Sequence, residues 1–348
     1  MSEQKTKERV WARWVVLGAI LLGVFLFTGI GLNIKPIMPE VFLPGEVIDL
    51  VDLDNPSPLF GIPGLYMTNT FVGMIGADIV VFLIAFFVYR GVKSGAMALS
   101  GVSGAVEALL EALHNMTEGT AGKWTKDIFP WFATITLLVL SANWLGLVPG
   151  VETIGLIHEG HGEYSVRTVA GIQTIWDDSA EMAADAHGEE AVAEHGEEEH
   201  HGASIVPFFR PVSTDLNFTF ALALVAVVMV QVIGFKALGW GYLTKFWNTK
   251  HFFDKPIFGF IDFGVGLLEL VSELSKVLSF AFRLFGNLFA GAVLIFVMGS
   301  LVPFFVPAMF YMLELFVGMI QAIVFGMLTM TFMAQATQSH GDHDEAHA

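Results

Sequence analysis

Cysteine is absent from this 348-residue chain. Without a thiol there is no disulfide framework, no thiolate metal site and no cysteine nucleophile, whichever compartment the loops face. Basic residues are scarce as well, since 17 Lys and Arg stand against 34 Asp and Glu, for a formal net charge of -17. Such an acidic chain is not expected to bind nucleic acid, whose phosphates need a basic surface.

Long stretches of the chain lack charged residues almost completely. The sequence is 54% hydrophobic despite its acidity, so the apolar and acidic parts must be separated along the chain. A helix needs ~20 apolar residues to cross the ~30 Å hydrocarbon core. The apolar runs therefore predict an all-α, polytopic membrane protein with about five to six membrane helices. The predicted spans are 14–34, 65–89, 128–151, 216–235, 257–299 and 308–336.

The spans and the composition divide the chain into five parts. The first apolar run follows four basic residues and is longer than an ordinary signal-sequence core, which indicates a signal anchor more than a cleaved leader. A Glu, His, Ala and Gly bias predicts a largely disordered loop in the middle of the chain. The parts are 1–34 (anchor or leader), 35–151 (first membrane helices and a cytoplasmic connector), 152–215 (acidic, His-rich loop), 216–338 (core helices) and 339–348 (charged tail).

Lysine and arginine are distributed unevenly between alternate loops. With the N-terminus inside, twelve of them lie in inside segments and three in outside segments. Inside loops of membrane proteins carry the excess of Lys and Arg. The distribution therefore predicts that residues 152–215 are external and that the C-terminus is cytoplasmic.

The predicted helix 257–299 carries Arg283, after which no charged residue occurs before Glu314. A charged side chain at the bilayer centre costs at least ~2.5 kcal/mol, so the arginine is a functional hypothesis, with a snorkelling or ion-paired structural arginine as the alternative. The helix would be ~63 Å long, so it must tilt strongly, bend or begin outside the lipid. Polar and small residues at helical spacing place a stripe on one face: Glu269, Ser272, Lys276, Ser279, Arg283, Asn287 and Ala290.

Two sets of polar groups lie at different membrane depths from Arg283, one toward the cytoplasm and one toward the outside. In the predicted orientation Glu269 and Ser272 lie toward the cytoplasm, and Glu314 lies nearer the outside. A guanidinium stays protonated and cannot relay protons, so it can divide two proton entrances. Asp78, inside span 65–89, is either a carboxylate paired with polar neighbours or an element of an ion path. The candidate ion-path residues are Arg283, Asn287, Gln321, Glu314, Glu269, Ser272, Asp215 and Asp78.

The run LELVSELSKVLSFAFRLFGNLFAG from Leu268, with QAIVFGMLT from Gln321, closely resembles subunit a of the F-type ATP synthase. The motifs DLN from Asp215 and WLGLVP from Trp144 are also similar to that family. The resemblance extends over about residues 40–338. It implies a membrane stator whose strongly tilted C-terminal helical hairpin faces a rotating c-ring.

The resemblance also implies roles for single residues. Arg283 would face the essential carboxylate of the c-ring and block leakage between two half-channels, with Asn287 and Gln321 near it. Glu269 and Ser272 match the cytoplasmic half-channel, and Asp215 matches the outer one. Further implied partners are subunit b of the stator stalk and the remaining complex, in a bacterial inner membrane. The chain would be no enzyme by itself and would bind no nucleotide, cofactor or metal.

The sequence departs from the family pattern at two positions. Ala292 stands where many relatives carry Glu or His, and Glu314 stands where some carry His. We therefore expect Glu314 to supply the outer carboxylate, alone or with Asp78. The coupling ion stays open between proton and sodium, with the proton as default. The loop 152–215 is either a solvated linker or a proton-collecting antenna.

A divalent-metal or secondary transporter with a His-rich collecting loop is the alternative function. All eleven histidines lie outside the predicted spans, and no span shows paired His and Asp spacing. No internal repeat with matched broken helices supports a secondary transporter. The polar stripe favours the ATP synthase interpretation.

Overall fold

The structure is a computed structural model that describes residues 45–48, 58, 62, 66–93, 102–148, 151, 154–169, 172–176, 203–246, 256–301 and 306–338. The predicted N-terminal anchor, residues 177–202 of the loop and the tail 339–348 lie outside these ranges. The chain divides into two compact units. The first comprises Met1–Val72, Leu147–Arg210 and Phe289–Leu315, and the second Gly73–Gly146, Pro211–Leu288 and Phe316–Ala348.

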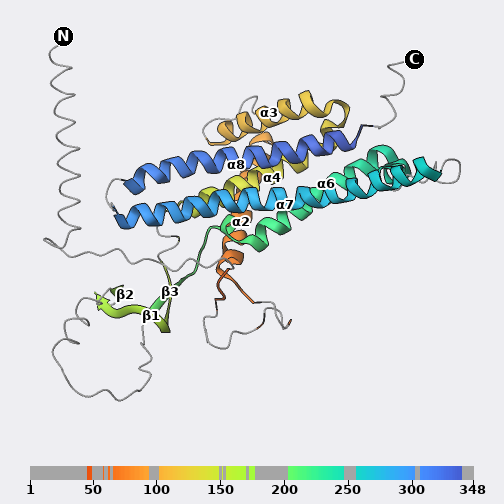
Figure 1. Ribbon diagram of the computed structural model, residues 1–348. Coiled ribbons are helices and arrows are strands. Elements are labelled where there is room, and N and C mark those ends of the chain that lie inside the picture. The colour runs from red at the N-terminus through yellow and green to blue at the C-terminus, as the bar shows by residue number, and fades with distance from the viewer. Residues whose placement is uncertain are drawn as a thin grey trace, which may run out of the picture. The chain divides into compact units, whose positions relative to one another are not determined.

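Helices dominate the described residues (Figure 1). Among the described residues, five helical segments are long and apolar enough to cross a membrane, which confirms the predicted all-α polytopic class. Spans 257–299 and 308–336 agree with α7 and α8 to within two residues. The helices are α2 (Asn69–Lys93), α3 (Val102–Ala121), α4 (Thr125–Gly146), α6 (Leu216–Leu238), α7 (Pro256–Leu301) and α8 (Val306–Ala336), with 3-10 turns η2 (Gly122–Trp124), η3 (Val212–Thr214) and η4 (Gly239–Lys245).

Helix α6 has a side-chain cap at one end and a glycine at the other. The Asp215 carboxylate accepts a hydrogen bond from the backbone N–H of Asn217 at 2.8 Å, which satisfies one of the free N–H groups of the first turn. Gly239 has φ 59°, a conformation that favours glycine, and donates its N–H to the carbonyl of Phe235. The helix begins at Leu216, where the sequence predicted the start of this span.

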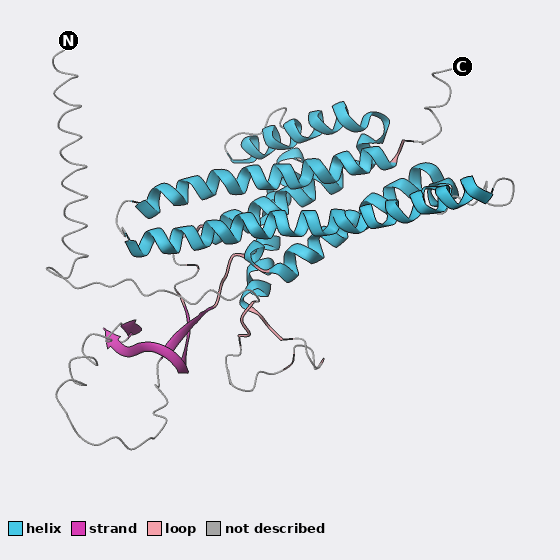
Figure 2. Ribbon diagram, in the orientation of Figure 1, coloured by secondary structure: helices cyan, strands magenta, loops and turns pink. Residues whose placement is uncertain are grey.

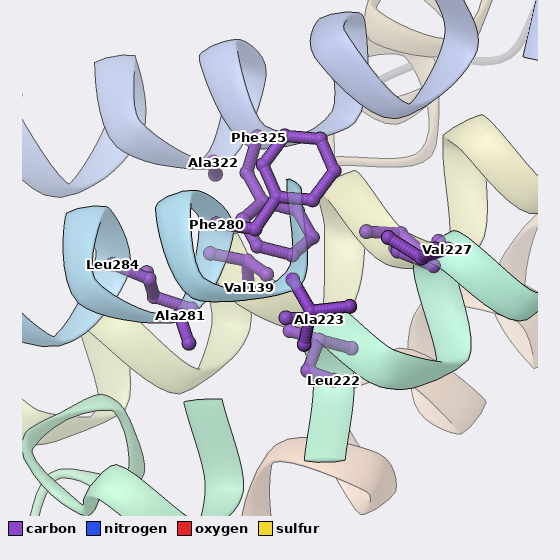
Figure 3. Packing of buried hydrophobic residues seen from close by; sticks show 12 residues of the cluster. Val139, Leu222, Ala223, Val227, Phe280, Ala281, Leu284, Ala322 and Phe325 are labelled. Atoms are coloured by element: carbon purple, nitrogen blue, oxygen red, sulfur yellow. The ribbon is translucent and has the colours of Figure 1, made fainter. Parts of the chain in front are cut away.

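The main hydrophobic core lies in the second unit, where α4, α6, α7 and α8 meet. Phe280 of α7 packs against Phe325 of α8, with ring centroids 5.1 Å apart. Figure 3 shows Phe280 and Phe325 among Val139 of α4 and Ala223 of α6. Alanines from three of these helices, Ala223, Ala281 and Ala322, are fully buried and allow close packing.

A second cluster in the same unit holds η4 against α6. The ring of Tyr242 is almost fully buried and packs against Phe235 and Phe246, with centroids at 5.2 and 5.9 Å. Gly234 provides the space, because a Cβ there would lie 2.6 Å from the Cζ of Tyr242. Gly266 of α7 likewise lies against the carbonyl oxygen of Phe246. The η4 segment is therefore held by α6 and α7 together.

A three-stranded antiparallel sheet lies in the first unit, drawn in magenta in Figure 2, with strand order β2-β1-β3. Its strands are β1 (Gly155–Val169), β2 (Ile172–Trp176) and β3 (Ala203–Pro207). The sequence predicted a largely disordered loop over 152–215, and the three strands are ordered parts of it that were not predicted. The densest run of Glu and His lies in 177–202, whereas the strands contain β-branched and aromatic residues that favour sheet pairing.

Candidate functional site

Part of the polar stripe of α7, including Arg283, lies on an exposed flank of that helix. Buried residues recur along another face of the helix, namely Val277, Phe280, Ala281, Leu284 and Leu288. At 100° per residue, the stripe is centred roughly 115° around the helix from these buried positions, so it lies on a flank of the helix. Ser272, Ser279, Arg283 and Ala290 are exposed, whereas Glu269, Lys276 and Asn287 are half-buried. The role of the stripe as an ion path stays a prediction.

Arg283 extends from this exposed face. Its Nη2 donates to Ser279 Oγ at 3.5 Å, one turn earlier on the same helix, which is a long and weak hydrogen bond. Across the described ranges, no carboxylate lies within ion-pair distance of Arg283. Gly286, on the next turn, has nothing within 4 Å of an added Cβ. The cation thus points out of the chain beside a surface that a partner helix can approach closely.

Glu314 of α8 is buried in the first unit and lies against α7. Its carboxylate occupies the space that a Cβ on Gly291 would need, so any side chain at 291 would collide with it. Its Oε1 has no hydrogen-bond partner among the residues described. An unsatisfied buried carboxylate oxygen is costly, which marks Glu314 as a functional candidate.

Gln321 and Asn287 are less exposed than Arg283. Gln321 is buried, and its Nε2 finds no acceptor in the part of the chain that the structure describes. Asn287 is half-buried on α7. No hydrogen bond between either side chain and Arg283 occurs within the described ranges. Their predicted place beside the arginine stays a prediction.

A buried polar cluster between α4, η3 and α8 lies two residues from Asp215 in the chain. Asn143 of α4 accepts from Ser213 Oγ at 2.7 Å and donates to the carbonyl of Gly318 at 3.1 Å. Asp215 is buried beside Ser213 and caps α6. The capping role was missed from the sequence, although an Asp directly before an apolar run is a helix-start signal. The cluster itself joins residues 70 and 175 positions apart, which no local pattern reveals.

The remaining candidates have different environments. Asp78 is half-buried on α2, next to Ala77, which packs against Ala142 and Val212. Glu269 is half-buried and Ser272 is exposed, both on α7.

The structure also reveals a polar network that was not among the candidate site residues. Glu273 of α7 accepts hydrogen bonds from Gln231 Nε2 of α6 at 3.0 Å and from Lys276 Nζ at 2.8 Å. Gln231 in turn accepts from the hydroxyl of Tyr242 at 2.7 Å. The spacing of three residues between Glu273 and Lys276 was visible in the sequence and typical of a helical ion pair.

Comparisons with known proteins identify relatives of this chain. The chain is 28% identical over 271 residues to ATP synthase subunit a of Gloeobacter violaceus, covering 78% of this chain and 85% of the relative. It is 25% identical over 248 residues to ATP synthase subunit a of Geobacter sulfurreducens, covering 71% and 77%. The subunit a of Moorella thermoacetica is 34% identical over 136 residues, and there the match spans only 57% of the relative.

The family profile described as ATP synthase A chain matches residues 71–334. This range begins in α2 and ends in α8, so it contains the five helical segments that can cross a membrane almost completely. It also contains Arg283 and the whole polar stripe. The chain therefore belongs to the ATP synthase A chain family.

Proposed function

We propose that this chain is the membrane stator subunit of a rotary ATP synthase, which forms two proton half-channels against a rotor ring and couples proton flow to ATP synthesis. The single observation that carries the proposal is Arg283, exposed on α7 with no ion-pair partner in the described ranges. A fixed, exposed cation can interact with a carboxylate that another subunit carries past it. The chain is a membrane component of the complex and no enzyme by itself.

In the proposed mechanism, the guanidinium of Arg283 attracts the ionised form of a rotor carboxylate and so favours release of its proton. The proton leaves to one half-channel, and the carboxylate takes a proton from the other after passing the arginine. Because the guanidinium does not lose its own proton, it blocks direct transfer between the half-channels. Each charge that crosses is worth ~2.3 kcal/mol per 100 mV of membrane potential, which rotation carries to a soluble catalytic head.

The candidate residues divide between the half-channels. We assign Glu269 and Ser272 to the cytoplasmic half-channel. Glu314 belongs to the external one, alone or with Asp78, and Asp215 lies at its outer end. The support for Glu314 is its burial and its Oε1 without a described partner. Asn287 and Gln321 would position Arg283 or the rotor carboxylate during passage.

The assembly follows from the same proposal. The exposed stripe faces the c-ring, and the stator stalk subunit b and the catalytic head complete the complex. The bias of Lys and Arg supports a cytoplasmic C-terminus and a loop 152–215 outside a bacterial inner membrane. The proton is the proposed coupling ion. The family match does not favour the metal-transporter alternative.

Arg283→Ala tests the proposal in inverted membrane vesicles. We expect ATP-driven proton pumping to vanish while the complex assembles to wild-type amount, because the exposed side chain of Arg283 does not contribute to the buried core. Passive proton leak is measured in the same vesicles, and an increase would show that Arg283 also separates the half-channels. Arg90→Ala is the matched control, since Arg90 is an exposed arginine at the end of α2. Intact pumping in assembled Arg283→Ala complexes would overturn the proposal.

A further inference from the structure

The ion pair of Glu273 and Lys276 neutralises a second cation on α7. The Glu273 and Lys276 side chains are 8% and 20% exposed, and their charged atoms lie 2.8 Å apart. Lys276 precedes Arg283 by seven residues, which corresponds to ~10.5 Å along the helix. Without Glu273, the ammonium of Lys276 would be an uncompensated charge close to the proposed cytoplasmic half-channel.

Groups from three other elements hold this pair in place. Gln231 of α6 binds the second carboxylate oxygen of Glu273, and Tyr242 of η4 fixes Gln231. On the other side, the ammonium of Lys276 lies 4.6 Å from the centroid of the Phe332 ring of α8, in cation–π contact. Lys276 is thus held by both the carboxylate and the ring, so its charge is kept from the exposed face.

Stability alone is a weak explanation for such a pair. Replacing a buried ion pair by apolar residues of similar volume is often neutral or stabilising, because two charges must be desolvated to form it. In a helix that must keep one cation available to a rotor carboxylate, however, the neutralised lysine has a consequence for function. A nearby positive charge lowers the local concentration of protons and attracts the same carboxylate as Arg283.

We propose that Glu273 is a positioning residue for proton transfer: it holds and neutralises Lys276, so that Arg283 acts as the uncompensated cation of the described part of α7. This inference rests on the proposed function. Gln231 and Tyr242 serve the same end by fixing the carboxylate, and Phe332 by receiving the ammonium. The proposal concerns the charge at the cytoplasmic entrance and adds no group that itself carries the proton.

The test measures the medium pH at half-maximal ATP-driven proton pumping in inverted vesicles, whose cytoplasmic face is outside. Glu273→Gln leaves Lys276 positive, which repels incoming protons, so the midpoint is expected to fall by about 0.5 to 1 pH unit. Lys276→Gln leaves a carboxylate and should move the midpoint upward. The double variant carries neither charge and is expected near the wild-type midpoint.

If the Glu273–Lys276 pair only stabilises the structure, the variants should give a different result. Both single variants would then lower the amount of assembled complex or the maximal rate without moving the midpoint, and that result overturns the inference. If Glu273→Gln fails to assemble, Lys276→Gln decides alone, since an upward shift supports the inference and no shift contradicts it. Glu111→Gln, on the exposed side of α3, is the control with unchanged midpoint.

The Arg283→Ala variant separates this inference from the proposed function. Pumping lost in Arg283→Ala, together with unmoved midpoints in the single variants, overturns only the role of Glu273. Pumping retained in Arg283→Ala overturns the proposed function itself. Ionic strength provides a second test. The shift of the pH midpoint in Glu273→Gln should become smaller as salt screens the charge of Lys276.

Discussion

Replacing Gly291 by alanine tests whether the carboxylate of Glu314 has to lie against the backbone of α7. The added methyl group would occupy the space of the three carboxyl atoms. An ordinary van der Waals separation requires the carboxylate to retreat by about 1 Å. The side chain can rotate to do so, because the clash is with its flexible end and its Oε1 has no described hydrogen bond to lose.

The expected effect on stability is small. Alanine in a helix interior is favoured over glycine by about 1 kcal/mol, which offsets part of the roughly 1–3 kcal/mol that overpacking costs. The net change should therefore stay below about 2 kcal/mol and leave assembly intact. Pumping should fall at least about tenfold, since a displacement of 1 Å at a reacting group can cost up to about 100-fold.

The assay compares pumping rate, divided by assembled complex, for Gly291→Ala and two companions. Gly299→Ala is the matched control on the same helix, because its added Cβ would meet only Pro307 Cγ at 3.8 Å, an ordinary contact. Adding Glu314→Asp shortens the acidic side chain and should restore part of the rate. Wild-type pumping by Gly291→Ala would refute the reasoning, and so would an equal loss in Gly299→Ala.

Two further predictions concern the buried networks of the second unit. Gly234→Ala should lower stability by about 1–3 kcal/mol, because the ring of Tyr242 cannot move without losing its hydrogen bond to Gln231; thermal unfolding of the purified complex measures this. Gly264→Ala, with nothing within 4 Å of the added Cβ, is its control, and equal destabilisation would contradict the argument. Asn143→Leu should cost about 1–3 kcal/mol by leaving the buried hydroxyl of Ser213 without its acceptor. An unchanged unfolding temperature and normal assembly would refute that prediction.

The helices could be predicted from the sequence because a bilayer imposes one strong requirement on length and polarity. Span 257–299 and helix Pro256–Leu301 agree closely, since hydropathy decides where such a helix begins and ends. The exposed position of Arg283 was also predictable, because the apolar residues that are buried on α7 recur at helical spacing on a different face from Arg283. Both inferences need only the hydropathy and the spacing of residues within one segment of the chain.

The contacts between distant segments could not be predicted in this way. Gln231 was visible as a polar residue in an apolar span, but its partners Tyr242 and Glu273 depend on how η4 folds back against α6 and α7. The strands of residues 155–207 were missed for a related reason, because composition was averaged over a loop whose acidic part lies elsewhere. Averages conceal short segments whose pairing partners lie far along the chain.

Helix α2 shows how far the surroundings of a helix can govern its tolerance to substitution. Ala77 joins a buried cluster, whereas Phe82, Phe86 and Phe87 are 74%, 54% and 54% exposed. A mutational scan of the detergent-solubilised chain, scored by its unfolding temperature, would therefore find these phenylalanines replaceable by most residues. The same scan scored by membrane insertion would penalise every polar replacement, because lipid takes the place of the missing neighbours. Along α2, the tolerance to mutation therefore depends on whether detergent or lipid surrounds the helix.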